Sequence, residues 1–143
     1  MNSADRERSL LIMHGAGILL IGLLTGFMAV VEELAGSQPT IWRASHGALL
    51  LAGVWLLASG PVLPALVLPE KQRRALCWSL LVMGYAFTSA VLIQATTGVR
   101  ALSPHGSVWT LIAYVANLVT PAAGVIAAVL TVVGARAALR RAE

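Results

Sequence analysis

The chain alternates between long apolar stretches and short polar segments. Each apolar stretch is close to the roughly 20 residues that a helix needs to cross hydrocarbon, and they run over Ser9–Val31, Ala44–Leu68, Ala75–Thr97 and Val108–Val133. The connecting segments are Leu34–Arg43, Pro69–Arg74 and Gly98–Ser107. Helices satisfy their own backbone groups in lipid, and connections this short join antiparallel neighbours. The pattern therefore predicts one all-α membrane domain over residues 1–143, folded as an up-down bundle of four transmembrane helices.

Composition supports lipid as the solvent of this chain. Of its 143 residues, 58% are hydrophobic and only 11% are charged, whereas soluble domains carry about 25% charged residues. The single cysteine, Cys77, excludes an internal disulfide framework and a cysteine-based zinc site.

The basic residues predict the orientation of the helices. Cytoplasmic segments of membrane proteins are enriched in Lys and Arg. Only Arg43 and Arg100 lie on one side of the predicted bundle, and the other basic residues lie on the opposite side: Arg6, Arg8, Lys71, Arg73, Arg74, Arg136, Arg140 and Arg141. We therefore expect a multi-pass protein of a bacterial-type inner membrane with both termini in the cytoplasm. The formal charge of +4 comes from basic residues placed to orient the helices, so no nucleic-acid partner is expected.

Small residues recur at the spacing that lets membrane helices approach closely. Gly22 and Gly26 form a GxxxG pattern in the first stretch. Packing within the monomer is the simpler interpretation of this pattern. Four helices of this length also make a thin bundle, which favours a homo-oligomer.

The predicted membrane interior carries no charged side chain, because Asp, Glu, Lys and Arg are absent from the middle of all the apolar stretches. Proton-coupled multidrug transporters of this size are expected to hold a carboxylate there. The chain also has no glycine-rich phosphate loop and no Ser-His-Asp pattern. These absences argue against a proton-driven transporter and against hydrolytic or nucleotide-dependent enzymes.

Three histidines remain as candidate ligands. His14 lies near the start of the first stretch, while His46 and His105 lie toward the opposite side of the membrane, where they could approach each other. A histidine near a helix end is often an interfacial hydrogen-bonding residue. Neutral imidazole is also a standard axial ligand of haem iron. The spacing alone leaves both interpretations of His46 open.

A few polar or aromatic side chains lie inside the predicted spans. Trp55 lies deeper than the other tryptophans and either faces a cofactor or packs in the bundle. Tyr85 has a hydroxyl that could donate a proton to a substrate. Thr88 has a hydroxyl of the kind that commonly bonds to its own helix. Asn117 has an amide that must find partners in lipid.

Several short motifs resemble those of a known family. The residues Met13-His14-Gly15 and the run Ile21–Phe27 resemble the first helix of the hydroxylaminobenzene mutases, which are related to the membrane-bound styrene oxide isomerases. The run Trp42–His46, followed by Gly53 seven residues after the histidine, is similar to the second helix of the isomerases, and the mutases share the histidine and the glycine. The helix layout and the length also agree, so the resemblance covers nearly the whole chain.

The resemblance implies a homotrimer that binds haem b at its subunit interfaces. It implies His46 as the axial ligand, and Gly53 and Trp55 as residues of the haem site. The implied activity is a redox-neutral rearrangement of a small apolar substrate at an epoxide C–O or a hydroxylamine N–O bond, with iron as the Lewis acid.

The sequence departs from the isomerases at positions where these carry polar side chains. Those positions hold Ala52, Met83, Phe87 and Val91. Tyr85, Thr88 and Asn117 are the nearest candidates to replace the missing catalytic groups. Two other functions stay open: a non-catalytic haem protein that carries electrons or senses a ligand, and a cofactor-free membrane interaction subunit.

Overall fold

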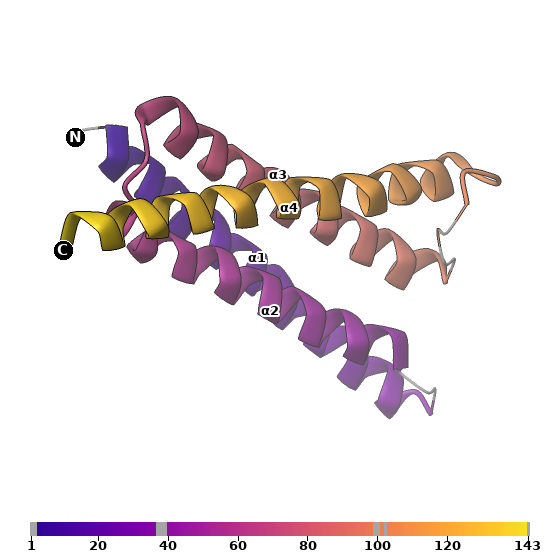
Figure 1. Cartoon of the computed structure of the whole chain (residues 1–143). Helices are drawn as coiled ribbons and strands as arrows, with labels where there is room; N and C mark the ends of the chain where they lie inside the picture. Colours follow the sequence, from indigo (N-terminus) through magenta and orange to yellow (C-terminus); the bar gives the residue numbers. More distant parts are fainter. Residues whose placement is uncertain (1–2, 37–39, 99–100, 102, 143) are drawn as a thin grey trace.

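In the computed structural model, which describes residues 3–36, 40–98, 101 and 103–142, the chain is all-helical in its described part. The long helices are α1 (Ser3–Leu34), α2 (Thr40–Val62), α3 (Glu70–Thr97) and α4 (Val108–Ala142). Each is long and apolar enough to span a membrane. The prediction of a multi-pass all-α protein is therefore confirmed. Consecutive helices run in opposite directions, and the N- and C-termini lie at one end, here named the terminal end (Figure 1). The other end is named the distal end.

Each helix reaches or extends past the ends of its apolar stretch, except at the end of the second. There the apolar run continues to Leu68, but α2 ends at Val62 and a short 3₁₀ turn, η1, covers Leu63–Ala65. Leu66 is then extended, with φ −83° and ψ 132°. Pro61 and Pro64 explain the break, because proline lacks the N–H that helix continuation needs. The predicted second helix was therefore too long at this end.

The helices pair as two hairpins, α1 with α2 and α3 with α4, which diverge toward the distal end (Figure 1). Glycines bring α1 and α2 into backbone contact. A Cβ atom built on Gly15 would lie 2.6 Å from the Leu57 nitrogen, and one on Gly22 would lie 2.9 Å from the Leu50 nitrogen. The prediction that the GxxxG glycines pack within the monomer is confirmed.

The two hairpins meet in the terminal half of the molecule, where one apolar core joins all the long helices. Its buried members include Leu11 and Ile18 of α1, Leu56 of α2, Leu80 of α3 and Ala127 of α4. The core ends well before the distal ends of the helices, so the hairpins are free to diverge there. The distal half of each hairpin is consequently held mainly by its own helix pair.

A buried ion pair fixes the start of α1 to the start of α3. The Nε atom of Arg73 lies 2.6 Å from the Oε2 atom of Glu7, and the side chains are only 17% and 9% exposed. The Nη2 atom of Arg73 also donates to the Ser3 hydroxyl at 2.8 Å. This cluster holds the terminal ends of the two hairpins together.

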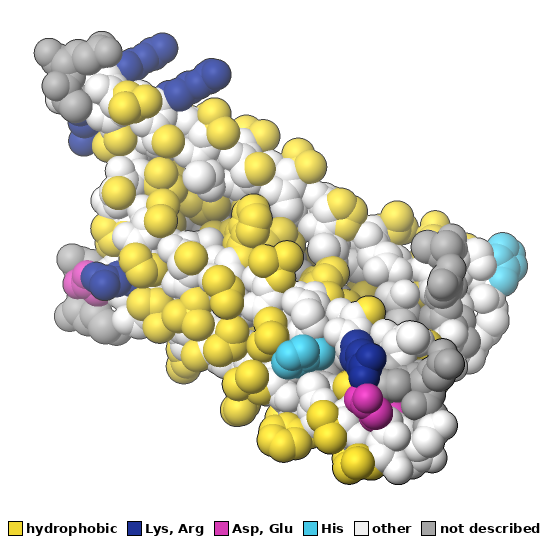
Figure 2. Space-filling view, turned by 90° about the horizontal axis from the view of Figure 1, so that it is seen from below, with side chains coloured by type: hydrophobic (Ala, Val, Ile, Leu, Met, Phe, Trp, Pro, Cys, Tyr) yellow, Lys and Arg dark blue, Asp and Glu magenta, His cyan; other side chains and the backbone are white. Residues whose placement is uncertain are grey.

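The outer surface matches a membrane environment. Hydrophobic side chains cover the visible face between the ends, and the basic and acidic side chains gather near the ends (Figure 2). Large apolar side chains such as Phe27, Trp78 and Val125 are more than half exposed. In water such a surface would be unfavourable, whereas lipid is as apolar as these side chains.

Candidate functional site

The first feature of the site is a hydrogen bond between the two helices of the first hairpin. His46 lies in the second turn of α2, and its Nδ1 atom is 2.7 Å from the carbonyl oxygen of Gly22 on α1. A carbonyl oxygen only accepts, so Nδ1 carries the hydrogen and the Nε2 atom keeps its lone pair. A backbone carbonyl behind Nδ1 is the usual partner of a metal-bound histidine. This arrangement fits His46 as an axial ligand of haem iron.

Gly26 provides the space for the imidazole ring of His46. A Cβ atom at Gly26 would lie 2.8 Å from the Nδ1 atom and 2.9 Å from the Cε1 atom of the ring. Any side chain at position 26 would therefore collide with the ring or push it aside. The GxxxG pattern thus has two separate uses, since Gly22 admits the backbone of α2 and Gly26 admits His46. The sequence indicated only close packing here.

Gly53 lies in the same helix contact, seven residues or about two helix turns after His46 on α2. A Cβ atom at Gly53 would lie 2.6 Å from the backbone nitrogen of Leu19. Close approach to α1 is therefore sufficient to require glycine at this position. In the single chain, Gly53 serves the helix contact that supports His46.

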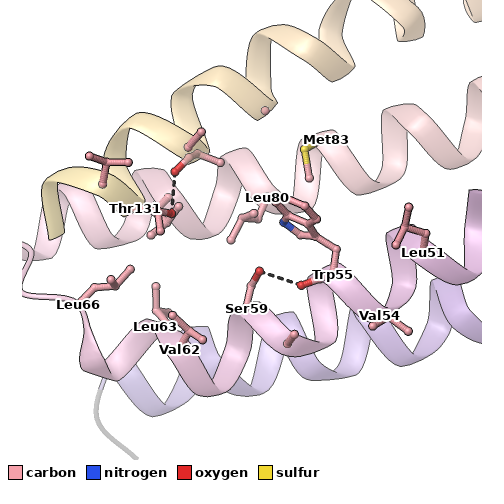
Figure 3. Close-up of a pocket in the computed structure, with 16 residues that line it drawn as sticks. Leu51, Val54, Trp55, Ser59, Val62, Leu63, Leu66, Leu80, Met83 and Thr131 are labelled. Atoms are coloured by element: carbon pink, nitrogen blue, oxygen red, sulfur yellow. Dashed lines mark hydrogen bonds between the residues drawn. The ribbon is translucent and has the colours of Figure 1, made fainter. Parts of the chain in front are cut away.

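Trp55 faces a different region from His46. It lines a cavity of about 510 Å³ between α2, α3 and α4, in the terminal half of the molecule. Its indole extends from α2 toward Leu80 and Met83 of α3 (Figure 3). The structure therefore does not bring the predicted haem residues His46 and Trp55 together within one chain.

Tyr85, the predicted proton donor, is hydrogen-bonded to a histidine of another helix. Its hydroxyl oxygen lies 2.6 Å from the Nδ1 atom of His14, and the two rings meet edge to face with centroids 5.5 Å apart. Tyr85 is 46% exposed on the outer surface. Both residues lie in chain segments that cross the membrane, but their sequence separation gives no hint that they meet.

Thr88 and Asn117 use their polar groups within the fold. The Thr88 hydroxyl is buried and donates to the Gly84 carbonyl of its own helix at 2.8 Å. The Asn117 amide donates to the Ala101 carbonyl at 3.1 Å and so attaches the connection between α3 and α4 to α4. The structure records no contact of Tyr85, Thr88 or Asn117 with His46 among the described residues. A shared site would need a second chain.

No hydrogen bond or ring contact joins His105 to His46 in the described part of the chain. It is exposed in the connection before α4, on the hairpin that diverges from the one carrying His46 (Figure 1). No cluster of three or more His, Cys, Asp or Glu side chains forms among the residues that the structure describes.

A second, smaller cavity of about 280 Å³ lies near His46 in the distal gap between the hairpins. Ser45 and Ala48 of α2 line one wall, and Val91 and Gln94 of α3 line the other. Gln94 donates to the Ala90 carbonyl of its own helix at 3.1 Å. The Nδ1 atom of His46 faces α1. The residues that line this cavity lie on another face of α2 and on α3, so the cavity lies beside the histidine.

Comparison with known proteins places the chain in a family. Residues 7–136 match the family model described as styrene oxide isomerase. Neither the curated proteins nor the solved structures give a match. The matched range includes most of every long helix, together with His46, Gly22 and Gly26. The chain belongs to the styrene oxide isomerase family.

Proposed function

We propose that this chain is a membrane-bound isomerase that binds haem b through His46 and rearranges a small apolar substrate without net oxidation or reduction. The membership of the isomerase family supports the reaction class. The observation that carries the cofactor assignment is the bond between His46 Nδ1 and the Gly22 carbonyl. It orients the ring and leaves Nε2 available as a ligand.

The bound haem would supply a Lewis-acidic iron that polarises an epoxide C–O or a hydroxylamine N–O bond. The residues of the chain position and enclose the reactants. Gly26 keeps space for the His46 ring, and Gly22 fixes its rotation. The surrounding apolar helices exclude water, which would otherwise hydrolyse or solvate a polarised substrate.

We propose a homotrimer in which a neighbouring subunit completes the site. Tyr85 lies on the outer surface, bonded to His14, where a neighbouring chain would meet it. A tyrosine hydroxyl backed by an imidazole can return a proton to a substrate oxygen. Thr88 and Asn117 keep a supporting role in this proposal, because the Thr88 hydroxyl and the Asn117 amide each already donate a hydrogen bond within the fold.

We also propose that the terminal end faces the cytoplasm of a bacterial-type cell. The basic residues of that end, such as Arg73, Arg74 and Arg140, support this orientation. The haem held by His46 would then lie toward the non-cytoplasmic side of the inner membrane. An apolar substrate would reach it from the bilayer.

The deciding experiment is an absorption spectrum of the detergent-purified protein, oxidised and reduced, after haem supplementation. We expect a Soret band that is lost in His46→Ala and kept in His105→Ala, the matched control on the same side. Styrene oxide and hydroxylaminobenzene are then tested as substrates. Absence of a Soret band in the wild type, or full haem content in His46→Ala, contradicts the proposal. A low-spin bis-histidine spectrum would instead indicate an electron carrier.

A further inference from the structure

Within one chain, the cavity that Trp55 lines is separate from His46, which is not among its lining residues. It is bounded by α2, α3 and α4, and no histidine or charged side chain lines it. Its volume of about 510 Å³ falls in the range typical of small-molecule sites, about 300–1,000 Å³. Small residues on α4, including Gly124 and Ala128, leave this space open opposite the larger side chains of α3.

The lining offers almost no free polar group. The only hydroxyls of the lining belong to Ser59 and Thr131. Each donates to a carbonyl of its own helix at 2.8 Å, Ser59 to Trp55 and Thr131 to Ala127 (Figure 3). A polar or charged molecule would lose its hydrogen bonds on entering such a space. The cavity therefore selects uncharged, apolar molecules.

The terminal end of the cavity is closed by the chain that follows α2. Leu66 lines the cavity, and the next residue, Val67, donates its N–H to the Gly134 carbonyl of α4 at 3.2 Å. Gly134 has no room for a side chain, since its Cβ would lie 2.9 Å from the Cγ atom of Leu68. A phospholipid anchored at this end cannot pass its acyl chain along the bundle axis into the cavity.

The side of the cavity remains open toward the surface that faces lipid. Val62 of α2 and Val132 of α4 both line it, and they are 49% and 50% exposed. The helices that carry them belong to different hairpins, so no tight helix contact seals the gap between them. A molecule dissolved in the bilayer can enter sideways at this point.

We propose that this cavity is a second ligand site, which binds an uncharged aromatic molecule entering from the bilayer between α2 and α4. The Trp55 indole provides an aromatic surface inside the cavity against which such a ligand stacks. The proposal is independent of the proposed haem at His46. Its test therefore needs no cofactor and no enzymatic activity.

The test measures quenching of tryptophan fluorescence by 1-bromonaphthalene in lipid nanodiscs. One variant keeps only Trp55, and the control keeps only Trp78, with the remaining tryptophans replaced by Phe in each. The control is well matched, because Trp55 and Trp78 are 59% and 60% exposed, while only Trp55 lines the cavity. We expect saturable quenching of Trp55 and only weak, linear quenching of Trp78.

A substitution that fills the cavity provides the second arm. Ala128→Phe places a ring in the cavity and should weaken the quenching of Trp55 by at least about tenfold in apparent affinity. Ala122→Phe adds the same ring at an exposed position of α4 outside the lining and should change nothing. In the wild type, 1-bromonaphthalene should raise the melting temperature, and Ala128→Phe should abolish this shift.

Three results would overturn the proposal. Linear and equal quenching of Trp55 and Trp78 would mean that the probe only partitions into lipid. Stronger quenching of Trp55 by phosphatidylcholine brominated in its acyl chains, without saturation by 1-bromonaphthalene, would assign the cavity to lipid. Chemical cross-links between cavity residues of two chains, with no quenching by the probe, would assign it to a subunit contact.

Discussion

The Nδ1 atom of His46 lies 2.7 Å from the carbonyl oxygen of Gly22, across the contact between α1 and α2. The Gly22 oxygen also accepts from the Thr25 hydroxyl at 2.6 Å. The same carbonyl therefore accepts one donor from its own helix and one from α2, which ties His46 to the contact between α1 and α2. The orientation of the ring therefore depends on how tightly the two helices pack.

Replacement of Gly26 by alanine should disturb His46 directly. The new Cβ atom would lie 2.8 Å from Nδ1, so the ring must rotate or the helices must separate, at a cost of about 1–3 kcal/mol. We expect a lower melting temperature in detergent and reduced haem content after supplementation. The measurements are thermal unfolding by circular dichroism and the Soret absorbance per chain.

Gly47→Ala is the matched control for this substitution. Gly47 is next to His46 on α2, and a Cβ atom there would meet nothing within 4 Å. Removal of a mid-helix glycine should leave stability unchanged or raise it by about 0.5–1 kcal/mol. An equal fall in melting temperature and haem content in Gly26→Ala and Gly47→Ala would mean that the space at Gly26 does not position the His46 ring.

Replacement of Glu7 by glutamine should destabilise the terminal end of the bundle. Arg73 would be left buried without its carboxylate partner, and loss of one member of a buried ion pair costs about 3–5 kcal/mol. The exposed pair of Arg74 and Glu70, at 3.5 Å, gives the control. Glu70→Gln should change the free energy of unfolding by less than about 1 kcal/mol.

The Glu7 prediction is checked by a double-mutant cycle with Arg73→Leu, measured by unfolding in mixed micelles. The double variant should be more stable than Glu7→Gln alone, because no unpaired charge remains. If the two losses simply add, the side chains are not coupled and the proposed clamp between α1 and α3 is wrong.

Tyr85→Phe should remove the hydrogen bond to His14 and leave the Nδ1 atom without a partner. Single polar contacts between membrane helices contribute about 0.6 kcal/mol on average, so we expect a small loss of stability. If Tyr85 acts in catalysis, kcat should fall much further than stability does. Tyr114→Phe is the control, because the structure records no hydrogen bond of Tyr114 within its described part. Similar kcat values in both variants would exclude Tyr85 as the proton donor.

Asn117→Ala should loosen the connection between α3 and α4. The amide donates to the carbonyl of Ala101, which is only 1% exposed. Loss of the amide therefore removes a buried hydrogen bond that contributes about 1 kcal/mol. We expect faster proteolysis near residue 101 with little change in global unfolding. Thr120→Val, which removes only a bond within its own helix, serves as the control. Unchanged proteolysis in Asn117→Ala would contradict this structural role and return Asn117 to the list of substrate-binding candidates.

Much of the fold was predictable because lipid imposes simple rules. A span of hydrocarbon requires about 20 apolar residues in a helix, so the apolar stretches and the short connections were enough to predict the helices and their antiparallel order. The break after α2 was less predictable. The prolines marked it, but only the fold shows that Val67 attaches to Gly134 on another helix.

His46 could be named from the sequence as a candidate ligand, because neutral imidazole binds haem iron, although its spacing alone left an interfacial role open. The space for its ring follows from the register in which the two helices of the hairpin pair. When the first two stretches pack as an antiparallel hairpin, Gly26 lies against His46. In the same register Gly22, four residues earlier, lies against Leu50, four residues later. The sequence pattern suggested close packing, but it gave no means to fix that register or to see which carbonyl would face the ring.

The sequence by itself determined the helices and the glycine-rich contact, since these follow from local hydrophobicity and residue type, and it offered His46 as a candidate ligand. Only the tertiary structure decided the partners of the polar groups and the position of the cavity. His14 meets Tyr85, Glu7 meets Arg73, and Trp55 faces away from His46 into a space between the hairpins. The physical reason is that lipid constrains the length and polarity of a helix but leaves its rotation and neighbours to side-chain packing.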